Sequence, residues 1–488
     1  MSDELMKLDA IAQAALVRAR EVEPCELVDA AIARIERVDP QLNAVILPAF
    51  ERARDRAKAL SAAARTADEL PPFLGVPFLL KDLGGQEAGA PCHLGMCFLK
   101  QANWVEPNDS YFTEKLGRAG FISLGRTNTP ELGLLPTTEP EAYGPTRNPW
   151  SLGHSPGGSS GGAGAAVAAG LVPAAHASDG GGSIRIPAAH CGLVGLKPTR
   201  GRNSFGPLAG ERWGGFSCEL VVSRSVRDTA AILDVTNGPM PGDPYAAAAP
   251  ARLYADQIRT TVRPLRIGLL ARAPRGDVEV HSACAEAAML TARELEGLGH
   301  HVEESFPEAL ADPEGMRAFV TVVACNVARA LDTVSEKVGK TIGSADVEPL
   351  TWILAELGRA CSAPQYIAAI DVTHTLGRRL APWWERFDLL LTPTTAQPAP
   401  HLGDLVPSIE NPLEGYARSA PYGCFTASFN QSGQPGISLP MHQTGEGIPV
   451  GAQLVAAYGR EDLLLRVAAQ LEQARPWKDR WPDLVSRA

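Results

Sequence analysis

Two short loops in the first half of the chain concentrate serine and glycine. One reads Ser155-Pro-Gly-Gly-Ser-Ser-Gly-Gly-Ala-Gly, and the other reads Ser178-Asp-Gly-Gly-Gly-Ser-Ile-Arg-Ile-Pro. Successive glycines allow backbone N–H groups to converge on one point, as an anion site or an oxyanion hole requires. The loops therefore predict a site that stabilises negative charge, with Ser183 at the end of the second loop.

The segment between the loops, as far as Gly170, is almost wholly alanine, valine and glycine. It predicts a helix of small side chains, which can pack very close to a neighbouring backbone and hold the two loops side by side. A flexible linker is the usual alternative for a Gly/Ser run. It is disfavoured because the loops recur within 24 residues around an apolar helix and lead into a proline-bounded segment that contains Arg185.

The two loops, together with Gly195-Leu-Lys-Pro-Thr, form a run of about 45 residues that resembles the signature of the amidase signature family of serine amide hydrolases. Four further segments look like other blocks of that family, and the resemblance covers most of the chain. They are Gly75-Val-Pro-Phe-Leu-Leu-Lys-Asp, Gly125-Arg-Thr-Asn-Thr-Pro-Glu, Tyr143-Gly-Pro-Thr-Arg-Asn-Pro-Trp and Phe429-Asn-Gln-Ser-Gly-Gln-Pro-Gly-Ile-Ser-Leu-Pro.

The resemblance implies a catalytic triad made of Ser183, Ser159 and Lys81. Ser183 would be the nucleophile, Lys81 the base, and Ser159, preceded by a cis peptide bond, the relay of the proton between them. The backbone N–H groups of Gly180, Gly181, Gly182 and Ser183 would hold the developing oxyanion.

Three further residues are expected to support this site. Ser160 is a hydrogen-bond partner, and Asp179 and Arg185 orient the second loop, although a plain surface role for either is the alternative. The chain departs from the family pattern at Gly180, where a threonine or a larger apolar residue is usual. We expect this substitution to loosen the oxyanion loop.

Lys81 can act as a base only if its pKa is far below the ordinary value. At a reference pKa of ~10.4 only about one lysine in 2500 is neutral at pH 7, so a shift of ~3 units, roughly 4 kcal/mol, is needed. Lys81 follows the apolar run Phe78-Leu79-Leu80. Burial there would disfavour the ammonium, whereas a solvated strand end is the alternative. We expect Lys81 to be buried.

Apolar runs of strand length alternate with helical segments and predict an α/β fold. Together with the family resemblance, they indicate a large, mixed, mostly parallel sheet covered by helices on both faces. Strands are expected at 76–80, 121–124, 193–196, 265–270, 301–303, 389–392, 436–439 and 451–455, and helices at 282–298, 314–338, 364–387 and 461–473.

One domain is expected over residues 1–488, in four segments. They are N-terminal helices over 1–60, a catalytic core over 61–235, an additional α/β lobe over 240–385, and core strands with a closing helix over 386–488.

Charge and composition exclude several classes of partner. The net charge is -10 with no basic run, which counts against nucleic acid and anionic membranes. The longest charge-free stretch, 148–178, is interrupted by Pro156 and Pro173, so we expect no membrane span. Nine cysteines without a C-x-x-C spacing fit neither a disulfide framework nor a zinc site. We expect a cytoplasmic enzyme without metal or cofactor, and a homodimer is one of the oligomeric states left open.

Other motifs carry weaker signals. Gly153-His-Ser-Pro-Gly matches the G-x-S-x-G elbow but lacks the flanking strand and helix that the elbow needs. His154, His176 and His190 are expected to be ordinary hydrogen-bonding residues. Cys325 is expected in the core, with a pocket-facing thiol as the alternative.

Within the family, Thr138-Glu-Pro-Glu-Ala and Lys197-Pro-Thr-Arg-Gly-Arg resemble the subgroup that hydrolyses cyclic aminohexanoate dimers, that is, nylon oligomers. This implies a neutral cyclic or linear amide as substrate, with carbamates and aryl amides as alternatives. A charged amide is disfavoured because the sequence identifies no counter-ion for it. The amidase-like subunit of a transfer-RNA amidotransferase and a membrane-bound lipid amidase are the less favoured functions.

Overall fold

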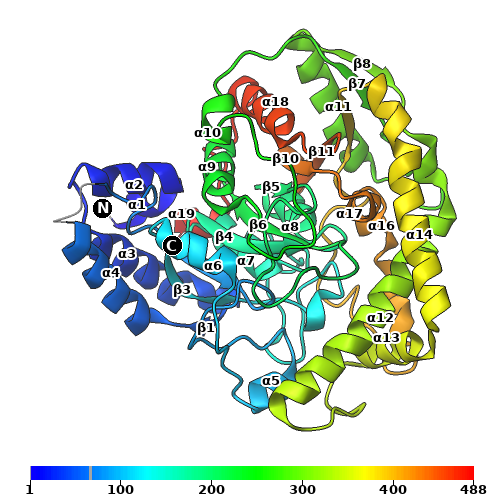
Figure 1. Cartoon of the computed structure of the whole chain (residues 1–488). Helices are drawn as coiled ribbons and strands as arrows, with labels where there is room; N and C mark the ends of the chain where they lie inside the picture. Colours follow the sequence, from blue (N-terminus) through cyan, green and yellow to red (C-terminus); the bar gives the residue numbers. More distant parts are fainter. Residues whose placement is uncertain (1, 65–68, 488) are drawn as a thin grey trace.

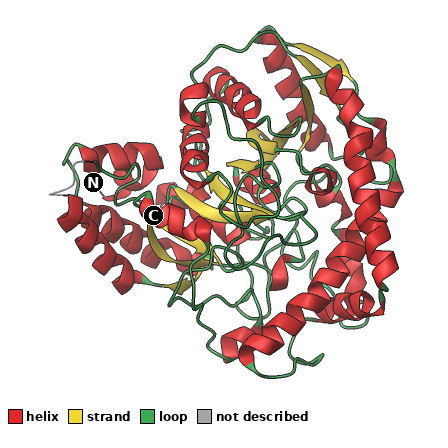
Figure 2. Cartoon of the chain, in the orientation of Figure 1, coloured by secondary structure: helices red, strands yellow, loops and turns green. Residues whose placement is uncertain are grey.

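The computed structural model describes residues 2–64 and 69–487, so the outermost positions of the expected 1–488 unit lie outside it. One sheet of 11 strands runs through the molecule from the N-terminal helices to β7 and β8 (Figures 1 and 2). The strand order is β1-β3-β2-β4-β6-β5-β10-β11-β9-β7-β8. The strands are β1 Val45–Pro48, β2 Pro77–Lys81, β3 Ile122–Thr127, β4 Ala174–Asp179, β5 Val194–Lys197, β6 Cys218–Ser223, β7 Arg266–Leu269, β8 His301–Glu304, β9 Leu389–Pro393, β10 Gly436–Gln443 and β11 Pro449–Ala456.

The sheet is mixed, as expected, but the prediction that it is mostly parallel is wrong. Only four neighbouring pairs are parallel, namely β2 with β3 and with β4, and β7 with β8 and with β9. The other six described pairs are antiparallel. The connection between β10 and β11, residues 444–448, is too short for a crossover between parallel strands. These two strands therefore form an antiparallel hairpin at the centre of the sheet. β4 and β6, which the sequence analysis missed, form another of the six antiparallel pairs.

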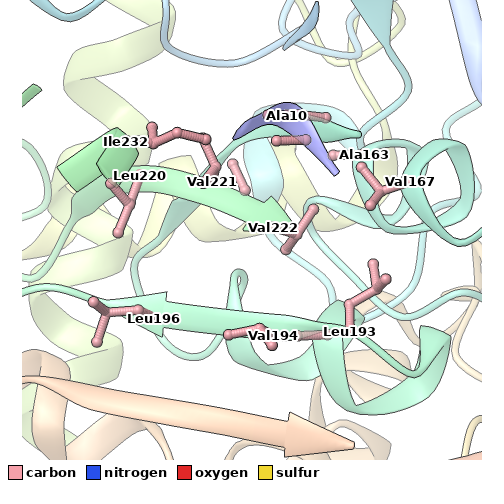
Figure 3. Packing of buried hydrophobic residues seen from close by; sticks show 14 of the residues in the cluster. Ala10, Ala163, Val167, Leu193, Val194, Leu196, Leu220, Val221, Val222 and Ile232 are labelled. Atoms are coloured by element: carbon pink, nitrogen blue, oxygen red, sulfur yellow. The ribbon is translucent and has the colours of Figure 1, made fainter. Parts of the chain in front are cut away.

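Both faces of the central sheet are covered. Every residue of β5, β6 and β11 is buried, which gives these strands the continuous apolar runs of a doubly covered sheet. Strands from all four expected segments join this one sheet. Figure 3 shows part of its core, with Leu220, Val221 and Val222 on β6, Leu193, Val194 and Leu196 at β5, and Ala163 and Val167 on α7 (Gly161–Ala168).

The predicted long helices form close to their expected bounds. The helices are α1 Ser2–Lys7, α2 Ala10–Arg18, α3 Pro24–Val38, α4 Phe50–Ala64, α5 Cys97–Gln101, α6 Tyr111–Arg118, α8 Arg185–Cys191, α9 Val226–Thr236, α10 Tyr254–Gln257, α11 Ser282–Gly297, α12 Pro313–Val338, α13 Pro349–Ala360, α14 Ala363–Leu380, α15 Pro412–Arg418, α16 Ala420–Gly423, α17 Ala427–Ser432, α18 Glu461–Ala474 and α19 Asp483–Arg487. The helix expected over 364–387 stops earlier, because Pro382 falls in a separate 3-10 turn, Ala381–Glu385.

Helix α12 is fixed at both ends by local chemistry. The side chain of Asp312 accepts a hydrogen bond from the backbone N–H of Glu314, Pro313 occupies the first turn, and Gly339 ends the helix in the left-handed conformation with φ 72°. By length and composition α12 alone, among residues 2–64 and 69–487, could cross a membrane, which is weak evidence because half of that window is buried. Helices α12, α13 and α14 lie on the far side of the molecule from α1–α4 (Figure 1).

Candidate active site

Helix α7 brings the two glycine-rich loops together. It is buried at every residue, and a Cβ added to Gly162 would lie 2.4 Å from the backbone nitrogen of Asn128. This close approach explains the small side chains that the sequence shows. At the start of α7, the Oγ of Ser160 donates to the carbonyl of Ser178 (3.2 Å) and accepts from its N–H (3.3 Å). Ser160 thus ties the first loop to the strand that leads into the second.

Lys81 is buried at the end of β2 and contacts two serine hydroxyls. Its Nζ lies 2.7 Å from the Oγ of Ser159 and 3.0 Å from the Oγ of Ser178. The peptide bond between Gly158 and Ser159 is cis, so that expectation is confirmed. Ser178 was missed as a contact, although it is the first residue of the second loop that the sequence analysis singled out. The base and the relay of the expected triad are therefore adjacent.

The environment of Lys81 favours the neutral amine. Complete burial lowers its pKa from 10.5 to about 7, against the opposing influence of the negative charges of Asp179 and Glu219. The expectation that Lys81 is buried is confirmed. A pKa lowered to about 7 allows neutral lysine to be populated at neutral pH.

The second loop runs from the end of β4 to the start of α8, with Ser183 half-buried. Gly182 has a φ of +142°, and a Cβ there would lie 2.5 Å from the Oγ1 of Thr426. Thr426 in turn donates to the carbonyl of Gly181 (2.6 Å). Ser183 makes no side-chain hydrogen bond within the described part of the chain, so its contact with Ser159 and the oxyanion role of residues 180–183 stay predictions.

A buried ion pair fixes the loop from behind. Arg185 binds Asp179 through two contacts, Nε to Oδ2 at 3.0 Å and Nη2 to Oδ1 at 2.9 Å, and both side chains are fully buried. Burial would raise the pKa of Asp179, but the charge and hydrogen bonds of Arg185 prevail and lower it to about 2. The orienting role predicted for this pair agrees with the geometry, whereas the alternative of a surface role is wrong.

Two amides complete this network and were not predicted. The Nδ2 of Asn430 donates to the backbone carbonyl of Asp179 (2.9 Å), while its Oδ1 accepts from Arg185 (2.6 Å). The Oε1 of Gln453 accepts from Nη1 of Arg185 at 2.8 Å. Asn430 lies within a segment that carried the family resemblance, which was the available signal, whereas nothing local distinguishes Gln453 in β11.

A cavity of about 270 Å³ opens at Ser183. Its wall includes Gly158 and Gly181 and is otherwise mostly apolar. The apolar side chains include Leu134, Leu135, Ile186, Trp213, Met316, Phe319 and Val320. Arg275, a charged residue that the sequence analysis did not identify as a counter-ion, also lines it. The sequence could not reveal this, because Arg275 lies on the connection between β7 and α11, far along the chain from the catalytic loops.

Two other residues that the sequence analysis singled out, His176 and Cys325, do not line the cavity at Ser183. The Nδ1 of buried His176 accepts the backbone N–H of Lys81 at 3.3 Å, as an ordinary hydrogen-bonding residue. Cys325 points toward the carbonyl of Gly358 (3.8 Å) and does not line the cavity, so the pocket-facing alternative is wrong. Within residues 2–64 and 69–487, no three His, Cys, Asp or Glu side chains cluster as metal ligands.

The chain is similar to known amidases over nearly its whole length. The amidase family model matches residues 26–465. The 6-aminohexanoate-cyclic-dimer hydrolase of Paenarthrobacter ureafaciens is 44% identical over 486 residues, covering 98% of this chain and 97% of that protein. The solved structure of a 6-aminohexanoate cyclic dimer hydrolase with substrate gives a TM-score of 0.94 at 43% identity, covering 98% of this chain and 99% of that one. A bacterial aryl acylamidase gives 0.88 at 30% identity, covering 99% of both chains.

Proposed function

This chain belongs to the amidase family, and from that premise we propose that it hydrolyses a neutral amide through an acyl-enzyme formed on Ser183. The observation that carries the proposal is the buried Lys81, whose Nζ lies 2.7 Å from the Oγ of Ser159. A lysine held neutral in contact with a hydroxyl can remove a proton that a charged lysine cannot.

The proposed reaction has two halves. Neutral Lys81 takes the proton of the Ser159 hydroxyl, Ser159 takes that of Ser183, and the Oγ of Ser183 attacks the amide carbonyl. The backbone N–H groups of residues 180–183 stabilise the oxyanion. Collapse of the tetrahedral intermediate breaks the C–N bond, and the departing amine takes a proton back through Ser159. Water then attacks the ester by the same route and releases the acid.

The substrate class that we propose is a neutral cyclic or linear amide, such as an aminohexanoate oligomer. Two features support it: the mostly apolar wall of the cavity at Ser183, and the 44% identity to a 6-aminohexanoate-cyclic-dimer hydrolase. Burial of methylene groups in such a wall gains ~25 cal/mol per Å². Aryl amides and carbamates are the alternative, which the likeness to an aryl acylamidase favours.

A four-substrate panel tests this proposal. Purified enzyme is given a cyclic amide, an aryl anilide, a carbamate and a primary amide, and kcat/KM is measured for each. We expect the cyclic amide to be hydrolysed best and the Ser183→Ala variant to be inactive on all four. Preference for the anilide or the carbamate would establish the alternative. Absence of hydrolysis of every member would refute the proposed activity.

We also propose a cytoplasmic location and action without a nucleic-acid or membrane partner, as a monomer or a homodimer. All nine cysteines are free, which fits a reducing compartment. Cell fractionation locates the activity, and light scattering of the purified protein gives its oligomeric state. Activity confined to the membrane fraction would contradict the proposal.

A further inference from the structure

Arg275 is an unusual member of an apolar cavity wall. Its side chain is only 14% exposed, and its Nε donates to Asp277 Oδ2 at 2.7 Å. Neither Nη atom donates to any residue in the described part of the chain. A guanidinium carries five N–H donors, so a mostly buried one with four of them unpaired has capacity for a ligand.

The backbone around Arg275 holds it in place. The N–H of Gly276 donates to the carbonyl of Ala273 (3.1 Å), which closes a turn around Pro274 and Arg275. Ala273 and Pro274 are buried, and Gly276 has a φ of +68°. The turn follows β7, which is parallel to β9, and ligands of such sheets bind beyond the carboxyl ends of parallel strands.

Tyr416 is a second donor in the same wall. It lines the cavity from α15, and its hydroxyl makes no hydrogen bond to any residue that the structure describes. Burial raises the pKa of Tyr416 to about 12, so the hydroxyl keeps its proton at neutral pH. Tyr416 is partly buried, and its unpaired hydroxyl is free to donate a hydrogen bond to a ligand in the cavity.

We propose that Arg275 and Tyr416 form a second subsite, which binds a carbonyl oxygen of the substrate remote from the bond that is cleaved. The substrate is thereby narrowed to compounds with two carbonyl groups, such as diamides. A neutral carbonyl fits better than a carboxylate, because Asp277 already balances the charge of Arg275. This inference rests on the proposed amide hydrolysis and deepens it.

Two linear amides of equal chain length test the subsite, one with a second amide carbonyl and one with a methylene group in its place. We expect wild-type enzyme to favour the diamide in kcat/KM, mainly through a lower KM. Arg275→Met should reduce kcat/KM for the diamide by about ten- to a hundred-fold, as for loss of a hydrogen bond to a charged group. The monoamide should change less than about three-fold, within the usual spread of surface effects.

Three matched variants separate binding from folding. Tyr416→Phe removes only the hydroxyl and should weaken the diamide alone, whereas Arg275→Lys should restore part of the preference. Asp277→Asn leaves the guanidinium charge unbalanced. It should improve kcat/KM for a linear amide of the same chain length that carries a carboxylate in place of the second amide. Equal losses for both amides in Arg275→Met, or no loss for either, would overturn the subsite.

Failure of the proposed reaction is distinguishable from failure of the subsite. If wild-type enzyme cleaves neither linear amide nor any member of the four-substrate panel, the proposed hydrolysis is wrong. Calorimetric binding of the diamide to Ser183→Ala, with and without Arg275→Met, then decides the subsite by itself. Weaker binding of the diamide to the double variant than to Ser183→Ala supports the subsite. Equal affinity for the two variants, or no binding to Ser183→Ala itself, refutes it.

Discussion

The indole ring of Trp213 packs against Gly180, the first glycine of the second catalytic loop. A Cβ added to Gly180 would lie 2.9 Å from Cε3 and 3.1 Å from Cζ3 of that ring. Trp213 also lines the cavity at Ser183. The expectation that a glycine here loosens the loop overlooked this ring, which fills the space that a larger residue would occupy.

Substitution at Gly180 should therefore act through Trp213. Gly180→Thr forces the ring to move, and overpacking of this kind costs about 1–3 kcal/mol. We expect lower kcat/KM and a lower midpoint of unfolding. The double variant Gly180→Thr/Trp213→Gly makes room for the new side chain and should recover much of both. Additive losses in the double variant, measured by kinetics and urea unfolding, would show that the two residues are not coupled.

Activity should rise with pH as Lys81 loses its proton. Because burial lowers the pKa of Lys81 to about 7, kcat/KM should increase through about pH 7 and then level off. Lys81→Arg stays charged and should lose about 10²–10⁴-fold while folded. The pH profile of kcat/KM measures the first effect, and circular dichroism checks the fold.

A substitution at Glu219 provides a second test of the pH dependence that is set by Lys81. The negative charge of Glu219 favours the ammonium form of Lys81, so Glu219→Gln should move the midpoint of the profile to lower pH. A chelator should leave wild-type activity unchanged. Chelator sensitivity, an active Lys81→Arg enzyme, or a flat profile between pH 5 and 9 would each count against the lysine as base.

The family resemblance of continuous segments implied the parts of the site that lie within them. Lys81 ends β2, Ser159 precedes α7, and the side chains of the two residues are in contact. Both residues lie in segments with recognisable motifs. The antiparallel pairing of β4 with β6 was missed, because the sequence analysis expected no strand in either segment. Arg275 and Gln453 could not be placed either, since only the folded sheet brings them near the second loop.

The ion pair behind the loop should be essential for stability. Asp179→Asn leaves the guanidinium of Arg185 in the interior without its counter-charge, which costs about 3–5 kcal/mol. Burial opposes ionisation of Asp179, but the charge of Arg185 prevails and lowers its pKa to about 2, so its contribution is present above about pH 4 and is lost as pH falls through about 2. Urea unfolding at pH 7 measures the loss.

A surface pair provides the comparison for this variant. The Oδ1 of Asp332 lies 3.3 Å from the Nη2 of Arg359, and both side chains are about half exposed. Asp332→Asn should cost less than about 1 kcal/mol. Similar losses for Asp179→Asn and Asp332→Asn would mean that the buried pair does not fix the loop.

Ser183 should be the residue that becomes acylated. A phosphonofluoridate or an activated carbamate should label wild-type enzyme once per chain, and peptide mapping by mass spectrometry should place the adduct on Ser183. Ser159→Ala keeps the nucleophile but loses the hydroxyl next to Lys81, so it should be labelled much more slowly. Stoichiometric labelling of Ser183→Ala would assign the nucleophile to another residue.

The choice between a neutral amide and glutamine decides between the two amidase functions that the sequence left open. The cavity at Ser183 is mostly apolar, and the Arg275 charge within it is already paired with Asp277. The ammonium and carboxylate groups of free glutamine would therefore lose hydration without gaining full partners. We expect kcat/KM for a neutral cyclic or N-aryl amide to exceed that for glutamine by at least about a hundred-fold, equivalent to ~2.7 kcal/mol. Steady-state kinetics on the single purified chain measure this ratio. A preference for glutamine would favour the amidotransferase function instead. Activity that requires partner subunits and transfer RNA would favour it as well.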